Sequence, residues 1–318
     1  MIDARAWWIV HRGRGELRTE ALRPALPGEL RIRMIASGVS RGTERLVLWG
    51  RIPEAERGRM RCPFQIGDFP WPVKYGYAAV GRIEDGARTG ERVFVLHPHQ
   101  DRFVVPEAAV TPIPADVGDA RATLAANMET ALNGFWDAEI LRGERVAVIG
   151  AGVVGLLVGC LVQQAQDAPV RIVDPDPARC DLARAMGLDA ALSPAGEFDV
   201  IIHASGHPDG LGAALDMAGF EARIIELSWF GDRPVTLPLG GAFHSQRLRL
   251  ISSQVGHVAR PMRGRVTHAE RMRRALAALA DPRFDRLLGP RVAFDTLPRN
   301  LPELLEAAPT PPHIVVTY

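Results

Sequence analysis

The sequence predicts an α/β protein in which a β-rich segment precedes a doubly wound parallel sheet. Residues 1–118 hold short apolar or alternating runs separated by glycines and prolines, a pattern typical of antiparallel strands. From residue 145 to residue 252, apolar β-branched runs alternate with helical stretches. Such a βαβα rhythm predicts a parallel sheet with helices packed against it.

The first segment is expected to contain several short strands and few helices. Residues 29–34 alternate apolar and charged side chains, as a half-buried strand does. A polar, glycine-bearing turn at 37–44 should open a helix at 45–49, and the proline- and glycine-rich stretch 51–72 should form a surface loop. A helix is expected over 119–137, and Asp119 suits its N-terminus. The other expected strands lie at 6–10, 16–21, 72–81, 90–96 and 101–105.

The second segment opens with an apolar run at 146–149, which Gly150, Gly152 and Gly155 follow in the spacing G-x-G-x-x-G. The first glycine permits a tight turn, and the second lets the backbone approach a pyrophosphate. The third lets the following helix pack closely on the strand. Val153 and Val154 lie at the N-terminus of that helix, where free amides and the helix dipole favour a phosphate.

The next apolar run, 170–173, ends on Asp174, about 20 residues after the glycines. A carboxylate there is placed to accept hydrogen bonds from the adenosine ribose and to repel a 2′-phosphate, which favours NAD over NADP. Later strands end near Ser205, Ser228 and Ser253, at the edge where such sheets bind ligands. These features predict a dinucleotide site; the alternative is that the glycines serve packing alone.

Composition excludes several other classes of protein. The chain has 318 residues, of which 47% are hydrophobic and 24% charged, which suits a globular enzyme of one or two domains. A net charge of +1 provides no field for nucleic acid or an anionic membrane. No apolar run approaches the roughly 18 residues of a membrane span, and no signal-peptide pattern opens the chain. The 3 cysteines are widely spaced, so we expect a cytoplasmic protein without disulfides.

The order of these segments resembles that of the medium-chain dehydrogenase/reductases over essentially the whole chain. The landmarks are Gly-Glu-Arg-Val-Phe-Val at 90–95, the glycine motif, and the paired strand ends near Ser228 and Ser253. The resemblance implies a chaperonin-10-like β domain at 1–125, completed by 257–318, and a Rossmann NAD-binding domain at 126–256. It also implies that Arg179 lies against the adenosine ribose. The strand expected at 247–252 would be the sheet edge through which the family commonly forms homodimers.

Within this family, the segment 37–44 (Ser-Gly-Val-Ser-Arg-Gly-Thr-Glu) looks most like bacteriochlorophyllide a dehydrogenases, which oxidise a hydroxyethyl side chain to an acetyl group. Ser40, Tyr77 and a residue near Ala126 stand where zinc-dependent members have their metal ligands. None of the three supplies a thiolate, imidazole or carboxylate. His97–Gln100 replaces the four cysteines of a structural zinc lobe. We therefore expect no zinc.

Five residues are candidates for the chemistry. Tyr77 is expected either to hydrogen-bond a substrate oxygen and exchange a proton with it, or to be a packed tyrosine. Lys74, the only lysine, would lower the pKa of Tyr77 or lie on the surface. Ser40 and Thr43 would form a proton relay or cap a helix, and Glu44 would accept a proton or cap the helix dipole.

Three histidines are expected to have other roles. His97 and His99 are expected to be polar loop residues, with proton shuttling as the alternative, and His203 is expected to be structural.

These expectations converge on a zinc-independent, NAD-dependent oxidoreductase that transfers hydride between nicotinamide and a carbinol or carbonyl carbon of a small organic substrate. Without zinc, a hydrogen bond from a group such as Tyr77 would polarise the carbonyl. Two alternatives remain open. One is reduction of an activated C=C bond, as in quinone and enone reductases, and the other is a non-catalytic NAD-binding sensor.

Overall fold

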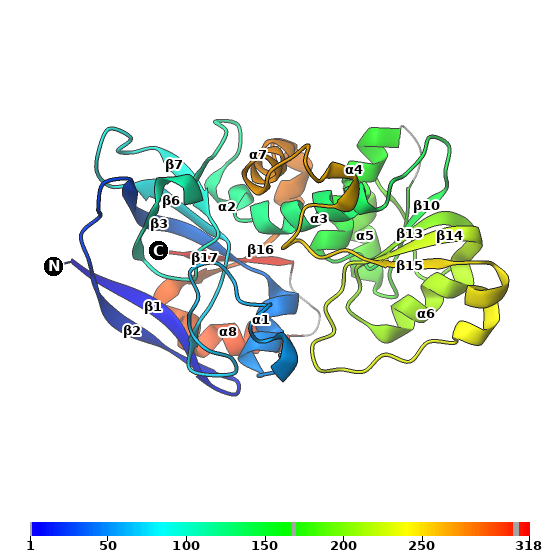
Figure 1. Ribbon diagram of the computed structural model, residues 1–318, viewed down its shortest axis with the longest axis horizontal. Coiled ribbons are helices and arrows are strands. Elements are labelled where there is room, and N and C mark those ends of the chain that lie inside the picture. The colour runs from blue at the N-terminus through cyan, green and yellow to red at the C-terminus, as the bar shows by residue number, and fades with distance from the viewer. Residues whose placement is uncertain (1, 167–169, 308–311) are drawn as a thin grey trace. The chain divides into compact units, whose positions relative to one another are not determined.

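The computed structural model describes residues 2–166, 170–307 and 312–318, and the chain divides into two compact units. Unit 1 comprises Met1–Ala126 and Leu276–Tyr318, and unit 2 comprises Asn127–Ala275. Figure 1 labels the elements of both units. The sequence analysis places the return to the first domain at residue 257, whereas unit 2 continues to Ala275.

Two sheets form unit 1. The smaller has the strand order β2-β1-β5-β4, and the larger has the order β16-β17-β3-β6-β7-β9 with β8 paired to β3. The larger sheet is mixed, because β16 and β17 are parallel whereas β17, β3 and β6 are antiparallel. The strands are β1 (Ile2–His11), β2 (Arg14–Leu22), β3 (Glu29–Val39), β4 (Ile66–Gly67), β5 (Val73–Lys74), β6 (Ala79–Ile83), β7 (Arg92–Val95), β8 (Arg102–Pro106), β9 (Thr111–Pro112), β16 (Leu288–Ala293) and β17 (His313–Thr317).

Outside the parallel sheet, the helices differ from the prediction in three places. The helix expected over 119–137 is interrupted, because Thr123 ends the first part and its hydroxyl donates to the carbonyl of Ala120. The two parts are α2 (Asp119–Ala122) and α3 (Ala125–Asp137). The sequence analysis also missed α8 (Leu297–Glu306), which contains Pro302 and buries Leu297, Leu301 and Leu305 on one face. The third difference is α1 (Arg41–Leu48), which begins at Arg41 instead of at residue 45.

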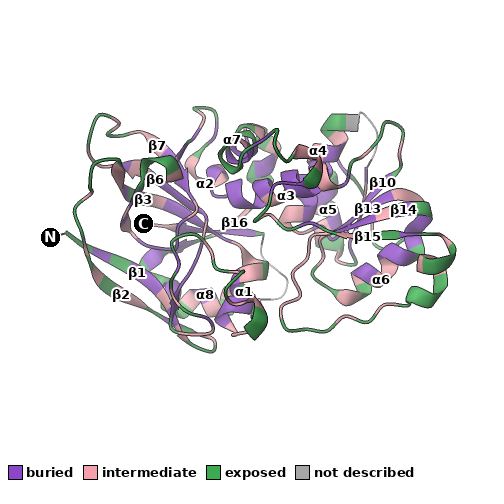
Figure 2. Cartoon of the chain, viewed as in Figure 1, coloured by how far each residue is buried: buried purple, intermediate pink, exposed green. Residues whose placement is uncertain are grey.

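Unit 2 contains a parallel sheet with the strand order β12-β11-β10-β13-β14-β15. Numbered along the unit, this order is 3-2-1-4-5-6, that of a Rossmann domain, and the order reverses between β10 and β13. Figure 2 shows that the central strands are buried, as their β-branched sequences require. The strands are β10 (Val146–Ile149), β11 (Val170–Val173), β12 (Asp189–Ala191), β13 (Phe198–His203), β14 (Ala218–Glu226) and β15 (Arg249–Ser252).

Helices pack against this sheet as the βαβα rhythm predicts. The first, α4 (Val153–Gln166), contacts β10 and β11, and α5 (Pro177–Ala185) contacts β11 and β12. The third, α6 (Pro208–Met217), contacts β13 and β14. The strand β15 lies at the sheet edge, as expected. In the part of the chain that the structure describes, no helix combines the length and apolar character needed to cross a membrane.

The helix α7 (His268–Ala278) explains why unit 2 extends beyond the predicted boundary. Its Arg271 is buried, and its guanidinium contacts Glu129 Oε1 at 3.0 Å and Asn133 Oδ1 at 2.6 Å, both on α3. The same guanidinium donates to the carbonyls of Val255 and His257. Four hydrogen bonds from one buried side chain therefore hold α7 and the preceding loop against α3.

Candidate functional site

The glycine turn between β10 and α4 has the geometry that its spacing predicts. Gly150 has φ +105°, and a Cβ there would lie 2.7 Å from the backbone of Ser205. A Cβ on Gly155 would lie 1.8 Å from the carbonyl oxygen of Gly150, so only glycine permits this close approach of helix and turn. A Cβ on Gly152 would meet no atom within 4 Å. The backbone at Gly152 is thus open to a ligand, as pyrophosphate binding requires.

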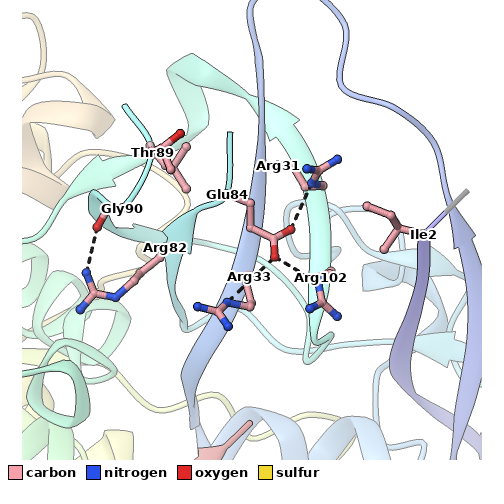
Figure 3. Close-up of a pocket in the computed structure, with 9 residues that line it drawn as sticks. Ile2, Arg31, Arg33, Arg82, Glu84, Thr89, Gly90 and Arg102 are labelled. Carbon is pink, nitrogen blue, oxygen red and sulfur yellow. Dashed lines mark hydrogen bonds and ion pairs between the residues drawn. The ribbon is translucent and has the colours of Figure 1, made fainter. Parts of the chain in front are cut away.

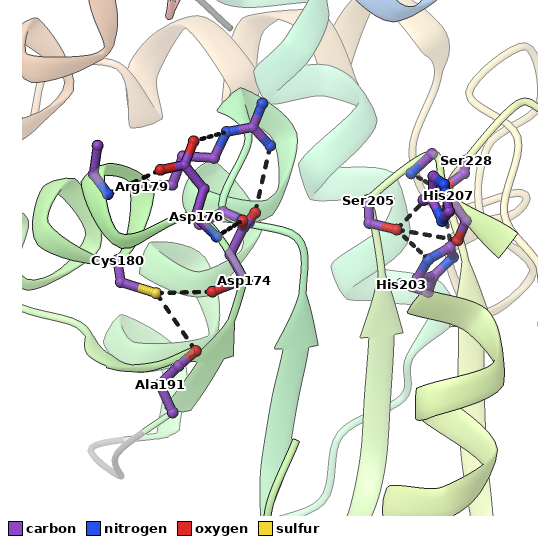
Figure 4. Close-up of polar contacts among 12 residues, drawn as sticks. Asp174, Asp176, Arg179, Cys180, Ala191, His203, Ser205, His207 and Ser228 are labelled. Carbon is purple, nitrogen blue, oxygen red and sulfur yellow. Dashed lines mark hydrogen bonds and ion pairs between the residues drawn. The ribbon is translucent and has the colours of Figure 1, made fainter. Parts of the chain in front are cut away.

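Asp174 directly follows β11 beside this turn, and its carboxylate already has partners in the protein (Figure 4). Oδ2 accepts from the amide of Ala151 at 2.8 Å and lies 3.4 Å from Nη1 of Arg179, and Oδ1 accepts from the amide of Asp176 at 2.9 Å. The side chain is almost fully buried. Because a carboxylate has about four acceptor positions, these bonds leave room for a ribose hydroxyl. Asp174 therefore fixes the shape of the glycine turn, a role that its sequence position did not reveal.

Two of the predicted strand-end serines share one histidine (Figure 4). His203 is buried at the end of β13, and its Nε2 lies 2.6 Å from Oγ of Ser205. Its Nδ1 lies 2.7 Å from Oε2 of Glu226 and 3.4 Å from Oγ of Ser228. Glu226 Oε1 also accepts from the amide of Ser228. The sequence analysis expected a structural His203, and the structure shows that it links both serines to a carboxylate.

The third serine is held elsewhere in unit 2. Ser253 donates to Oδ2 of Asp137 on α3 at 2.7 Å. Near the start of the same helix, Oδ1 of Asn127 is buried and has no hydrogen-bond partner among the described residues. A buried amide oxygen without a partner is costly, so this atom fits a ligand that supplies an N–H or O–H donor.

The catalytic candidates of unit 1 gather at the N-terminus of α1. The Tyr77 hydroxyl forms hydrogen bonds with Ser40 and Thr43, which lower its pKa, but burial is the larger effect and raises the pKa of Tyr77 well above its usual value. The phenol is therefore protonated at neutral pH and is suited to donate a hydrogen bond. Its ring packs edge-on against Tyr75, with centroids 5.9 Å apart. The structure thus brings three of the five candidates together.

Glu44, the fourth, links α1 to a buried chain of hydrogen bonds. Its Oε1 accepts from the amide of Ser40 at 2.8 Å, and its Oε2 lies 3.0 Å from Nε2 of His99. On the other side of the imidazole, Nδ1 lies 2.7 Å from Oγ of Ser37, which lies 2.9 Å from the hydroxyl of Tyr318. His99 and Ser37 are fully buried. The distances allow one direction of donation along the whole chain, in which Tyr318 donates to Ser37, Ser37 donates to His99, and His99 donates to Glu44.

Lys74 is not on the surface, and it is not among the groups that shift the pKa of Tyr77. Its ammonium is buried, 2.7 Å from Oε2 of Glu20 and 2.8 Å from Oε1 of Gln100. Burial, with Glu44 and Cys62 as further causes, raises the pKa of Tyr77, whereas Lys74 was expected to lower it. The pairing of β1 with β5 sets this position, because it places Lys74 opposite Trp8.

His97 and Cys62 are two further polar groups of unit 1. His97 stacks on Phe103 with a centroid distance of 3.7 Å, and burial lowers the pKa of His97 to about 3. Burial raises the pKa of the Cys62 thiol to about 12. Within residues 2–166, 170–307 and 312–318, no group of three or more His, Cys, Asp or Glu side chains is arranged to hold a metal ion.

Several curated proteins that match the sequence are dehydrogenases, and the matches are partial. D-Guloside 3-dehydrogenase of Escherichia coli (strain K12) is 30% identical over 138 residues, which are 39% of this chain and 39% of that protein. L-Threonine 3-dehydrogenase of Rhizobium etli (strain CIAT 652) is 31% identical over 116 residues, which are 36% of this chain and 33% of that protein. The chain thus matches less than two fifths of the length of these relatives. No family model matches the sequence.

Solved structures match the whole chain and define its fold class. One is a protein of Sinorhizobium meliloti 1021, named a zinc-binding dehydrogenase and bound to NADP, with a TM-score of 0.79, 18% identity and complete coverage of both chains. Another is a short chain alcohol dehydrogenase of E. coli CFT073 in complex with NADH, with a TM-score of 0.79, 17% identity and 99% coverage of each chain. The fold is therefore the α/β fold of alcohol dehydrogenase-like proteins, with a GroES-like and a Rossmann domain. The predicted fold class is confirmed.

Proposed function

We propose that the chain is a nicotinamide-dependent oxidoreductase that transfers hydride between the cofactor and a carbinol or carbonyl carbon. The observation that carries the proposal is the open backbone at Gly152 within a Rossmann sheet, next to the carboxylate of Asp174. The partial matches to guloside and threonine dehydrogenases support an activity of this class. When bound, the cofactor supplies the hydride chemistry.

The residues of unit 2 fit the binding of a dinucleotide. The amides of Val153 and Val154 lie in the first turn of α4, where a pyrophosphate binds in such domains. Ser205 and Ser228, oriented by His203, would hydrogen-bond the cofactor near the strand ends, whereas Ser253 would act through Asp137. Asn127 Oδ1 would accept a hydrogen bond from the bound molecule.

We propose NAD as the preferred cofactor, because the buried Asp174 carboxylate would repel a 2′-phosphate. Arg179 lies 3.4 Å from Asp174 and 3.6 Å from Asp176, so its charge is already opposed by two carboxylates. Asp174→Ala should weaken NAD binding and free Arg179 to accept a 2′-phosphate. Unchanged relative affinities for NAD and NADP in this variant would contradict the assignment.

In unit 1, the Tyr77 hydroxyl would donate a hydrogen bond to the substrate oxygen and thereby polarise a carbonyl. Ser40 and Thr43 fix the orientation of the phenol. The hydrogen bond from the Ser40 amide to Glu44 connects this region to the buried chain through His99. That chain would respond to charge at Tyr77 by shifting its protons within hydrogen bonds that already exist. Lys74 is not part of the proposal.

Zinc independence is proposed from the side chains that occupy the region. Ser40 and Tyr77 offer neutral hydroxyls that are hydrogen-bonded to each other, and zinc prefers thiolate, imidazole or carboxylate ligands. Two structural neighbours are named zinc-binding dehydrogenases, so metal content needs measurement. Elemental analysis of the purified protein should find well below one zinc per chain, and about one zinc per chain with loss of activity to chelators would refute this part.

The activity test compares two reactions on one preparation. Secondary alcohols with NAD, including hydroxyethyl-substituted aromatic compounds, would be oxidised to ketones if the proposal is right. The similarity of segment 37–44 to bacteriochlorophyllide a dehydrogenases makes the hydroxyethyl group the first choice. Turnover of enones with NADH, and not of alcohols with NAD, would favour C=C reduction instead. Binding of NADH without turnover on either panel would identify a sensor.

We also propose a cytoplasmic homodimer that forms through β15. This strand is the edge of the parallel sheet, and Leu250 on it is 39% exposed, so its backbone and an apolar side chain are available to a second copy. Light scattering at micromolar concentration should give twice the mass of 34.7 kDa. A monomeric mass would contradict the proposal.

A further inference from the structure

A row of arginines crosses one face of the larger sheet in unit 1 (Figure 3). Arg33 on β3 lies opposite Arg82 of β6 on one side and opposite Arg102 of β8 on the other. Directly opposite residues of antiparallel strands share a face, and Arg31 lies on the same face because it is two residues from Arg33. Four guanidinium groups therefore gather on one face, and none of them belongs to the candidate residues described above.

The carboxylates near this row do not balance its charge. Glu84 contacts Nε of Arg31 and Nε of Arg102, both at 3.1 Å, and its contact with Nε of Arg33 is 4.0 Å. Asp85 pairs with Arg31 at 3.0 Å. In the described part of the chain, the structure records no ion pair for Arg82, whose Nη1 donates to the carbonyl of Gly90 instead. Two carboxylates thus face four guanidinium groups.

Such an arrangement is less favourable without an anion than with one. Like charges directly opposite each other on neighbouring strands destabilise a sheet, and Arg33 has an arginine opposite it on both sides. Exposure to solvent relieves part of this repulsion, since the Arg33 side chain is 59% exposed. The excess of two positive charges matches a phosphate monoester, which carries about −1.5 to −2 at neutral pH.

The space in front of the row suits a small ligand. The four arginines, Glu84 and Thr89 are among the residues that line a cavity of about 610 Å³, within the usual range of roughly 300–1,000 Å³ for small-molecule pockets. Guanidinium groups bind phosphate oxygens through two parallel hydrogen bonds, which gives such a site geometric specificity as well as charge.

We propose that this cavity binds a small anion that carries a phosphate group, either inorganic phosphate or a phosphate monoester. Arg33 and Arg82 supply the uncompensated charge, and Arg31 and Arg102 are held in place by Glu84. The site is independent of the proposed oxidoreductase activity, because it shares no residue with the dinucleotide region of unit 2 or with the cluster around Tyr77.

The test measures binding of inorganic phosphate and of glycerol 1-phosphate to the full chain by calorimetry, with sodium chloride at matched ionic strength as the reference. The pocket variant is Arg33→Gln/Arg82→Gln. The control variant, Arg14→Gln/Arg59→Gln, removes the same charge from two exposed positions outside the cavity. The wild type and the control should bind both phosphates, and the pocket variant should bind them at least about tenfold more weakly, since hydrogen bonds to a charged group are lost.

Melting temperatures provide a second measurement, in which the pocket variant is expected to differ from the wild type in opposite directions without and with phosphate. Without phosphate, the pocket variant should be at least as stable as the wild type, because the substitutions relieve repulsion; with phosphate, only the wild type and the control should gain stability. If the double variant does not fold, Arg82→Gln alone is measured, since Arg82 has no recorded ion pair to lose.

Three results would overturn the proposal. The first is binding of phosphate that does not exceed the chloride reference, and the second is equal binding by the pocket and control variants. In the third, the wild type binds no soluble phosphate but does bind phosphatidic acid vesicles or duplex DNA, and the pocket variant loses that binding. The third result would identify a macromolecular anion as the partner.

Discussion

Gly152→Ala should abolish most dinucleotide binding without affecting folding. In the free protein, the added Cβ meets no atom within 4 Å, and the backbone at Gly152 is outside the left-handed region. The unfolding free energy should therefore stay within about 0.5 kcal/mol of the wild type. In the bound state, the same methyl group would occupy the space that the second glycine of the motif leaves for a pyrophosphate.

The expected loss of affinity follows from the hydrogen bonds that the pyrophosphate would no longer form. Two backbone amides at the start of α4 would be displaced from the phosphate oxygens, and a hydrogen bond to a charged group contributes about 1.5–3 kcal/mol. Losing both corresponds to about 3–6 kcal/mol, or a roughly 10²–10⁴-fold increase in the Kd. Titration of NADH fluorescence measures this change, and thermal unfolding of the same samples measures stability.

Two other glycines provide the controls. Gly212 on α6 also has open space around an added Cβ, so Gly212→Ala should change neither the stability greatly nor the affinity. Gly155→Ala should lose stability, because its Cβ would lie 1.8 Å from the carbonyl oxygen of Gly150. If Gly152→Ala binds NADH within about threefold of the wild type, on the order of 0.7 kcal/mol, the glycine turn does not hold the cofactor.

Three further predictions concern the other sites. Tyr77→Phe retains the ring and should lower turnover roughly 10²–10⁴-fold with little change in NADH affinity; turnover close to the wild type would place the chemistry elsewhere. Burial lowers the pKa of His97 and of His313 to about 3, so the stability that each contributes is present above pH 6.5 and is lost as the pH falls towards 3. Each should account for about 2 kcal/mol of lost stability at pH 5, and a urea midpoint unchanged between pH 7 and pH 5 would contradict this. Arg271→Met leaves Glu129 buried without its partner and should cost about 3–5 kcal/mol in urea unfolding, part of which the added change Glu129→Gln should restore. Failure of the second change to restore any stability would mean that the charge of Glu129 is not the cause.

The features that the sequence predicted correctly are those set by neighbouring residues. The glycine motif, its flanking strands and the terminal Asp174 lie close together in the chain, so their spacing alone specifies a Rossmann turn. The break between α2 and α3 is also local, but it depends on Thr123 bonding the carbonyl of Ala120 rather than continuing the helix. The helical spacing of apolar residues does not predict whether Thr123 forms this hydrogen bond.

The features that were missed depend on strand pairing between distant residues. Ser37 and Tyr318 meet because β17 pairs with β3, and His99 reaches Ser37 from a loop between other strands. These three residues are so far apart along the chain that no local sequence pattern indicates how their strands pair. The sequence analysis therefore interpreted His99 as a polar loop residue. The packing of His99 also explains the glycine at position 76, because a Cβ there would lie 2.8 Å from the His99 ring.

The burial of Lys74 makes it a chemical reporter of unfolding. It is the only lysine of the chain, and its side chain is 3% exposed. Its amine forms hydrogen bonds with Glu20 and Gln100. Acylating reagents need a free, deprotonated amine, so the side-chain amine should react only when β5 separates from β1. The rate at which an activated ester modifies Lys74 in native buffer would therefore measure how often this small sheet opens.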